Sequence, residues 1–259
     1  MFFIKTEDTD LYKIIQNISS YTHSPALLGS LIAGILMSVA VFNLLIVPIH
    51  NRVKYFLIRS FGDSTPFEQG VVSMSPRDNI HIVGFFSSLF LNIGFAAPAY
   101  YDDENFRHPK IYTVIISLSG IFTYFVFFGI SYFVYALLRL YNLFDISSIN
   151  LTTLDTGFFG CIYYAFFIMT YYLAITCIYS AIFNVLPVYP LDMGDTLYLC
   201  APVNWTDALR NNELMVSLGL FILCFLVLGT SDGLIYTISL PIRRTYMNLI
   251  SSLLGVPAG

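Results

Sequence analysis

Five long runs of apolar residues constrain this chain more than any other feature of its sequence. A helix needs about 20 mostly apolar residues to cross the hydrocarbon core of a bilayer. Charged residues make up only 11% of the 259 residues, against about 25% in soluble domains. The chain therefore has too few charged residues to cover the surface of a soluble fold. The sequence therefore predicts an integral membrane protein. The five runs are Ala26–Ile49, Ile80–Ala99, Ile111–Leu140, Phe158–Val185 and Leu214–Thr230.

The expected fold is an all-α, polytopic transmembrane helix bundle with about five spans. Residues 1–25 form an N-terminal flank that is too charged and interrupted to be a signal peptide, so the first run is expected to remain as a span. A last segment, Ile235–Leu254, carries Pro241, Arg243 and Arg244 in its middle. Charges are costly in hydrocarbon, so this segment is expected to be an interfacial or re-entrant helix with its arginines at the lipid headgroups.

The charge pattern restricts the partners. The net charge is −4 and no block of basic residues is present. Nucleic-acid binding depends on a basic patch that neutralises phosphates, so no nucleic acid is expected as a partner. The lipid bilayer is the one partner that composition predicts directly.

Two polar stretches at the ends of apolar runs are the candidates for chemistry. The first is His50-Asn51-Arg52-Val53-Lys54, directly after the first run, and the second follows the fourth run at Asn184–Asp195. Pro187 and Pro190 must interrupt the fourth helix, because proline lacks an N–H and clashes with the preceding turn. An interrupted helix that ends at an acid beside glycine indicates a shaped site inside the bundle. The alternative is a loop that leaves the membrane.

The second stretch carries a resemblance. Phe183 to Gly194, FNVLPVYPLDMG, resembles the N-x-x-P-x-x-P-L-D-G-G motif of the site-2 protease family of intramembrane metalloproteases. The motif positions here are Asn184, Pro187, Pro190, Asp192 and Gly194. Three further segments resemble the bacterial members in the same order: Phe61–Ser64, Gly94–Pro98 and Asn105–Lys110.

The resemblance covers about residues 26–200 and implies a site-2 protease-like membrane core there. Residues 201–259 would then add further C-terminal membrane helices. The resemblance also implies a bacterial cytoplasmic membrane as the location. Ser119-Gly120 matches another family segment, but the asparagine that would help to hold a substrate backbone is replaced by Tyr124.

In the family, two histidines four residues apart and the motif aspartate bind zinc, and a glutamate beside the first histidine acts as general base. The histidine and the aspartate are present here as His50 and Asp192, but Asn51 stands at the glutamate position and Lys54 at the second histidine. An amide cannot take a proton from water, and a protonated ammonium offers no lone pair to a metal. We therefore expect no catalytic residue, no bound metal and no other cofactor, with His50 and Asp192 as the remaining candidate ligands.

The predicted function is accordingly that of a pseudoprotease, which binds a membrane-protein client or regulates an active relative. The alternative is an active intramembrane zinc metalloprotease with a rearranged site, in which His81 and Asp78 replace the lost donors and zinc is the cofactor. A small-solute transporter is a third possibility, but such proteins place broken helices in paired halves, and the sequence contains no internal repeat.

The position of Lys54 suggests that its ammonium group replaces the positive charge of the metal. Residues at i and i+4 share one face of a helix, so Lys54 lies on the same face as His50. Buried charges in membrane proteins usually find partners. The hypothesis is that Lys54 takes the place of the metal charge and pairs with Asp192 inside the bundle. The alternative is that Lys54 reaches toward water and Asp192 is solvated at the surface.

Overall fold

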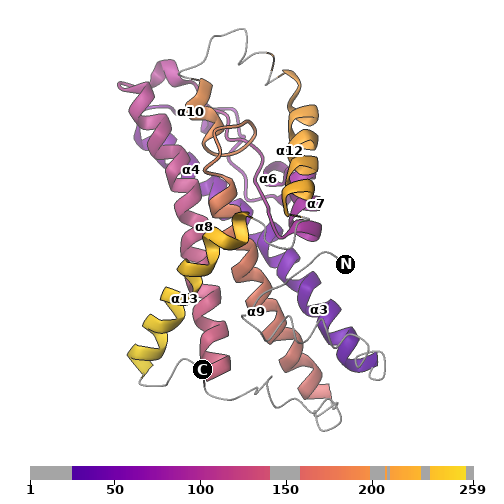
Figure 1. The fold of residues 1–259 in the computed structure, drawn as a ribbon. Helices are drawn as coiled ribbons and strands as arrows, with labels where there is room; N and C mark the ends of the chain where they lie inside the picture. Colours follow the sequence, from indigo (N-terminus) through magenta and orange to yellow (C-terminus); the bar gives the residue numbers. More distant parts are fainter. Residues whose placement is uncertain (1–24, 141–157, 199–207, 209–210, 229–233, 255–259) are drawn as a thin grey trace.

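The computed structural model describes residues 25–140, 158–198, 208, 211–228 and 234–254 (Figure 1). The described residues are mostly helical and contain no β-strand, only an isolated bridge between Ile80 and Ala96. The prediction of an all-helical bundle is therefore confirmed. Residues 1–24, which make up nearly all of the predicted N-terminal flank, lie outside the described part of the chain.

Three helical segments among the described residues are long and apolar enough to cross a membrane. They are Leu28–Ser60, Pro109–Leu138 and Gly160–Phe183, and they correspond to the first, third and fourth apolar runs. The chain is therefore a membrane protein.

The first span contains a widened turn. It consists of α3 (Pro25–Val41), the π-helical turn η1 (Phe42–Ile46) and α4 (Val47–Ser60). The Val47 N–H donates to the carbonyl of Phe42, five residues earlier. The turn ends two residues before Pro48, which has no N–H to donate. Inside the turn the Asn43 amide donates to Val39 O and Ser88 Oγ, both at 2.9 Å. These bonds tie the first span to the helix that carries Ser88.

Helix α9 (Phe158–Phe183) lies at the centre of the bundle, packed between α3 and α8 (Pro109–Leu140). Within its span, 78% of the most apolar window is buried, against 50% and 44% in the other two spans. Helix α3 approaches α9 closely at Gly34, where a Cβ would lie 2.6 Å from the carbonyl oxygen of Ala165. Small residues allow such close approach between membrane helices, so substitution at Gly34 would push the first span away from the central helix.

The prediction that Ile80–Ala99 forms a span is wrong. Its helix, α7 (Ile82–Leu91), has 10 residues and is only about 15 Å long at 1.5 Å per residue. Asn92 ends the helix in the left-handed region, at φ 55°. The chain then runs back as a non-helical segment, and Ala96 bridges to Ile80. Apolar side chains of the non-helical half, such as Ile93 and Phe95, are buried in the bundle, whereas Ile82 and Phe90 of the short helix are exposed.

The two C-terminal helices, α12 and α13, show where Arg243 and Arg244 lie. Helix α12 (Glu213–Leu228) has 16 residues. The fifth run ends at Thr230, which lies outside the described residues, so the expected membrane crossing of this run stays a prediction. Helix α13 (Leu234–Leu254) packs against α8 and α9. Arg243 is only 2% exposed, with its guanidinium 5.2 Å from the ring centroid of Tyr236. The prediction that Arg243 lies at the lipid headgroups is therefore wrong, although Arg244 is exposed.

Asp63 joins two loops at the polar end of the bundle. Its buried carboxylate accepts hydrogen bonds from the backbone N–H of Thr65 at 3.0 Å and from that of Asp102 at 2.9 Å. It also accepts bonds from the Thr65 hydroxyl and from Asn105 Nδ2. Burial acts to raise the pKa of Asp63, but these hydrogen bonds outweigh it and hold the pKa below its ordinary value.

Asp63→Asn is expected to lower the free energy of unfolding by about 1–3 kcal/mol at pH 7, because donors aimed at the carboxylate lose an acceptor. A carboxylate with a depressed pKa stabilises the fold above its unfolded pKa, and this contribution is lost as the pH falls through the folded pKa. The difference between wild type and variant should therefore be constant from pH 7 to pH 5 and shrink below about pH 4. Unfolding in detergent at several pH values measures it, and a difference that grows toward low pH would contradict this role.

Candidate functional site

A cluster of three charged or ionisable side chains lies between α4, α8 and the loop that follows α9. His50 and Lys54 come from α4, and Asp192 comes from the loop. Lys54 Nζ lies 3.0 Å from Asp192 Oδ1, and His50 Nε2 lies 2.8 Å from Asp192 Oδ2. The three residues are 1–5% exposed. The predicted pairing of Lys54 with Asp192 is therefore confirmed, and neither residue is solvated at the surface.

The loop after α9 holds Asp192 in place through Asn184. Helix α9 ends at Phe183, just ahead of Pro187. The Asn184 amide donates to Ser180 O at 2.8 Å and to Gly94 O at 3.3 Å, and its oxygen accepts from the backbone N–H of Asp192 at 3.3 Å. Asn184 therefore links the end of α9, the segment after α7 and the aspartate backbone.

The other motif positions shape the same loop. The peptide bond between Tyr189 and Pro190 is cis, and both residues are buried. A Cβ at Gly194 would lie 2.8 Å from the backbone nitrogen of Tyr189, so the chain can fold back on itself only with glycine there. Pro187 is exposed, unlike the buried Pro190.

Asn51 fixes the orientation of the His50 ring. The Asn51 Nδ2 group donates to Ala97 O at 3.1 Å, which turns its Oδ1 toward His50 Nδ1 at 3.0 Å. Because the other ring nitrogen faces the Asp192 carboxylate, both nitrogens of His50 face oxygen atoms. Both ring nitrogens are therefore engaged by neighbouring side chains, and neither is open to a metal.

Helix α8 closes the remaining side of the cluster through Gly120 and Tyr124. A Cβ at Gly120 would lie 2.5 Å from His50 Nε2 and 2.7 Å from Asp192 Oδ2. One turn further along, the fully buried Tyr124 ring stacks on the imidazole of His50, with ring centroids 4.6 Å apart. Tyr124 therefore covers one face of the histidine ring.

Gly120→Ala is expected to lower the free energy of unfolding by about 1–3 kcal/mol, because the added methyl overlaps the hydrogen-bonded pair of His50 and Asp192. Gly29→Ala, in α3, is the matched control: no atom lies within 4 Å of its added Cβ. Alanine also has the higher helix propensity, so the control should be neutral or stabilising. Thermal unfolding in detergent compares the two variants, and an equal effect of both would contradict the close packing at Gly120.

The cluster does not fit the zinc ion that a site-2 protease centre would hold. A tetrahedral protein site needs at least three convergent side-chain donors. Only His50 and Asp192 are available here, they bond directly to each other, and an ammonium lies 3.0 Å from the carboxylate. Within the part of the chain that the structure describes, no group of three or more His, Cys, Asp or Glu side chains is placed to hold a metal.

The donors proposed for a rearranged site lie elsewhere. His81 is the N-cap of α7, where its Nδ1 accepts from the N–H of Gly84 at 3.4 Å, and its ring lies 5.0 Å from that of Phe95. Asp78 is exposed in the short helix α6 (Pro76–Asn79). Neither residue joins His50 and Asp192.

Several contacts of the cluster could not be found from the residues alone. Gly120, Tyr124 and the segment Gly94–Pro98 stand out in the sequence, but only the fold shows that Gly94 O and Ala97 O accept bonds from the cluster's asparagines. Comparison with family models, with curated proteins and with solved structures finds no match to this chain. The fold and the site thus define a helical membrane protein with a buried Lys–Asp–His cluster.

Proposed function

We propose that this chain is a catalytically inactive, site-2 protease-like protein that binds a membrane-protein client or an active relative. The proposal is based on the sequence resemblance and on one contact, the 3.0 Å ion pair between Lys54 and Asp192. This pair places a cation of the chain itself beside the carboxylate that would otherwise ligate zinc. The proposed location is a bacterial cytoplasmic membrane.

Hydrolysis of a peptide bond by such a centre needs two functions that these side chains do not supply. Metal-assisted hydrolysis requires a bound water and a base that takes its proton. Asn51 stands where the base is expected, and its amide is used in bonds to His50 and Ala97. The two ring nitrogens of His50 are engaged by Asn51 and by Asp192, so the imidazole offers no open position to a metal. These features favour a binding role over the alternative, an active zinc protease with a rearranged site.

A cleavage assay separates the two functions. The full chain in lipid vesicles with added zinc should not cleave a reporter that contains one transmembrane segment, beyond the level of protein-free vesicles. Zinc-dependent cleavage that disappears in Asp192→Ala would instead establish the alternative enzyme.

Client binding is tested by photo-crosslinking in the native membrane. Phe122 lies on α8 two residues from Gly120, on the side that faces away from the cluster, and is 67% exposed. A photoreactive amino acid at this position would sample partners that contact the outer face of α8 at the depth of the cluster. The expected result is a crosslink to one defined membrane protein, weakened in a Gly120→Ala background. Crosslinks to lipid alone, from this position and from exposed Ile130, would argue against a client on α8.

A further inference from the structure

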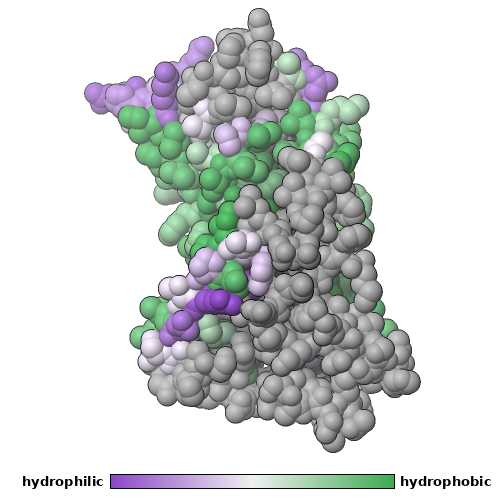
Figure 2. Space-filling model, in the orientation of Figure 1, coloured by the Kyte–Doolittle hydropathy of each residue, from purple (hydrophilic) through white to green (hydrophobic). Residues whose placement is uncertain are grey.

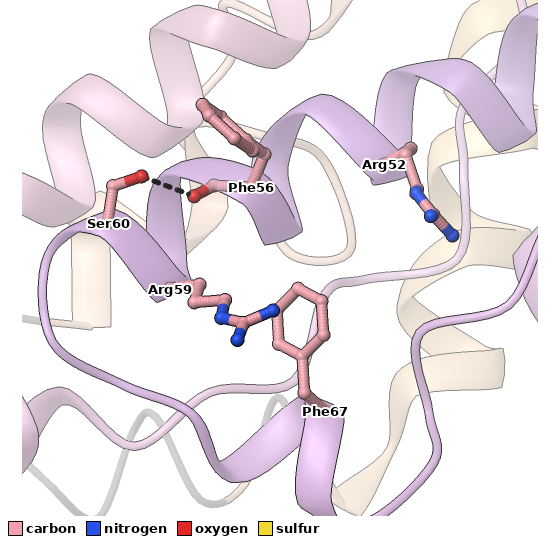
Figure 3. Close-up of a pocket in the computed structure, with 5 residues that line it drawn as sticks. All are labelled: Arg52, Phe56, Arg59, Ser60 and Phe67. Atoms are coloured by element: carbon pink, nitrogen blue, oxygen red, sulfur yellow. Dashed lines mark hydrogen bonds between the residues drawn. The ribbon is translucent and has the colours of Figure 1, made fainter.

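A pocket of about 440 Å³ lies on the outer face of α4, away from the buried cluster. Four of its lining residues, Arg52, Phe56, Arg59 and Ser60, recur on one face of α4, and Phe67 comes from the short helix α5 (Thr65–Glu68) (Figure 3). The four residues from α4 are exposed. The lining therefore contains two guanidinium groups and no carboxylate.

The two arginines lie about two turns apart on α4. The guanidinium of Arg59 lies over the ring of Phe67, 4.8 Å from its centroid, and Figure 3 shows the side chain pointing toward that ring. Stacking on an aromatic face leaves the N–H edges of a guanidinium available to an anion. Arg52 lies seven residues earlier on the same helix, a rise of about 10 Å. A group with several anionic oxygens can approach Arg59 with Arg52 as a second cation along the helix.

The pocket lies at the depth of lipid headgroups. The span Leu28–Ser60 has 33 residues, which gives a helix of about 50 Å, whereas the hydrocarbon core is about 30 Å thick. The span therefore exceeds the hydrocarbon by about 20 Å, and its α4 end lies toward the end of the molecule where hydrophilic residues gather above an apolar belt (Figure 2). Phe56, between the two arginines, is 69% exposed. Its ring gives the pocket an apolar side that suits an acyl chain.

We propose that this pocket binds the phosphate group of an anionic phospholipid, with Arg59 as the principal contact and Arg52 as the second. Arginine pairs with phosphate through two parallel N–H···O bonds. The positive pocket, the exposed phenylalanine and the position at the end of a spanning helix together favour a lipid over a soluble ligand. Glu68, on α5, bonds to Ser64 Oγ and is not part of the lining. This proposal is independent of the function of the buried cluster.

The test compares lipid binding by the full chain and by two double variants. Arg52→Gln/Arg59→Gln removes both cations from the pocket, and Arg77→Gln/Arg107→Gln removes two exposed arginines elsewhere, so the net charge is matched. Native mass spectrometry counts the phosphatidylglycerol retained by each protein in detergent. The pocket variant should bind this lipid about tenfold or more weakly than wild type, given the contribution of each basic residue near a membrane. The control should change by less than about twofold, because it leaves the pocket intact.

Two further measurements identify the ligand. Phosphatidylcholine, which is zwitterionic, should be retained less than phosphatidylglycerol by the wild type, and inorganic phosphate should not displace the bound lipid. Equal weakening in both double variants would show a general charge effect and overturn the proposal. Displacement by inorganic phosphate would overturn the lipid as the ligand and assign the pocket to a free anion. Equal retention of the two lipids would also overturn it.

Discussion

Lys54→His is expected to create a zinc site in the buried cluster, with close to one ion per chain. The substitution removes the ammonium that lies 3.0 Å from Asp192 Oδ1 and places an imidazole one turn after His50. Two histidines at i and i+4 share a helical face, and Asp192 supplies the third donor that a tetrahedral site needs. His50 would then be free to use Nε2 as a ligand while Nδ1 donates to Asn51, the arrangement that usually orients a ligating histidine.

Elemental analysis of the purified variant after gel filtration measures this gain. Arg52→His is the matched control, because it adds a histidine to the exposed face of the same helix without altering the cluster. Zinc should follow Lys54→His and not Arg52→His. Equal zinc in both variants, or none in a folded Lys54→His protein, would mean that the three side chains do not converge as the fold places them.

Loss of either partner of the Lys54–Asp192 pair is expected to destabilise the protein strongly. Removing one member of a buried ion pair leaves the other charge uncompensated and costs about 3–5 kcal/mol. Lys54→Met and Asp192→Ala should each lower the free energy of unfolding in detergent by an amount in this range. The double variant should lose clearly less than the sum of the two, because neither partner of the pair is left without the other.

Arg52→Met is the control for this comparison, since it removes an exposed cation from the same helix and should have little effect. The contradicting outcome is specific: a Lys54 variant that keeps full stability while Asp192→Ala loses it. His50 would then be the only partner that Asp192 needs, and Lys54 would not replace the metal charge.

The sequence predicted the class of fold, and it suggested this ion pair as one of two alternatives, each for a physical reason. Few charges and long apolar runs require lipid as the solvent, whatever the packing of the helices. A lysine and an aspartate at the ends of apolar runs require partners, because isolated charges in a membrane are costly. Asn184 could also be recognised as a candidate site residue, because it lies in the same Asn-x-x-Pro-x-x-Pro-Leu-Asp segment as Asp192.

The apolar run Ile80–Ala99 could not be predicted correctly from hydropathy. Hydropathy reports that side chains avoid water but not whether the backbone is helical. The left-handed residue Asn92 and the bridge between Ile80 and Ala96 turn the second half of the run into a non-helical segment inside the bundle. Such backbone is tolerated in a membrane only where it is buried in protein, and that burial depends on helices distant in the sequence.

Arg243 and Tyr124 illustrate the same limit. A charge in the middle of an apolar segment suggests a headgroup anchor, yet Arg243 faces inward on α13, 5.2 Å from the ring centroid of Tyr236. The resemblance marks Tyr124 only as the replacement of an asparagine, yet Tyr124 stacks on His50. Both placements depend on which face of a helix packs against its neighbours. In a chain so rich in aromatic residues, the spacing of residues does not predict that face.

The zinc content of the purified wild-type chain tests most directly whether Lys54, rather than a metal ion, neutralises Asp192. Cells grown with added zinc should yield protein with far less than one ion per chain, unchanged in the His50→Ala and Asp192→Ala variants. Zinc close to one ion per chain in the wild type, lost in both variants, would contradict the ion pair as the native state of the cluster and would restore the protease as the function to be tested.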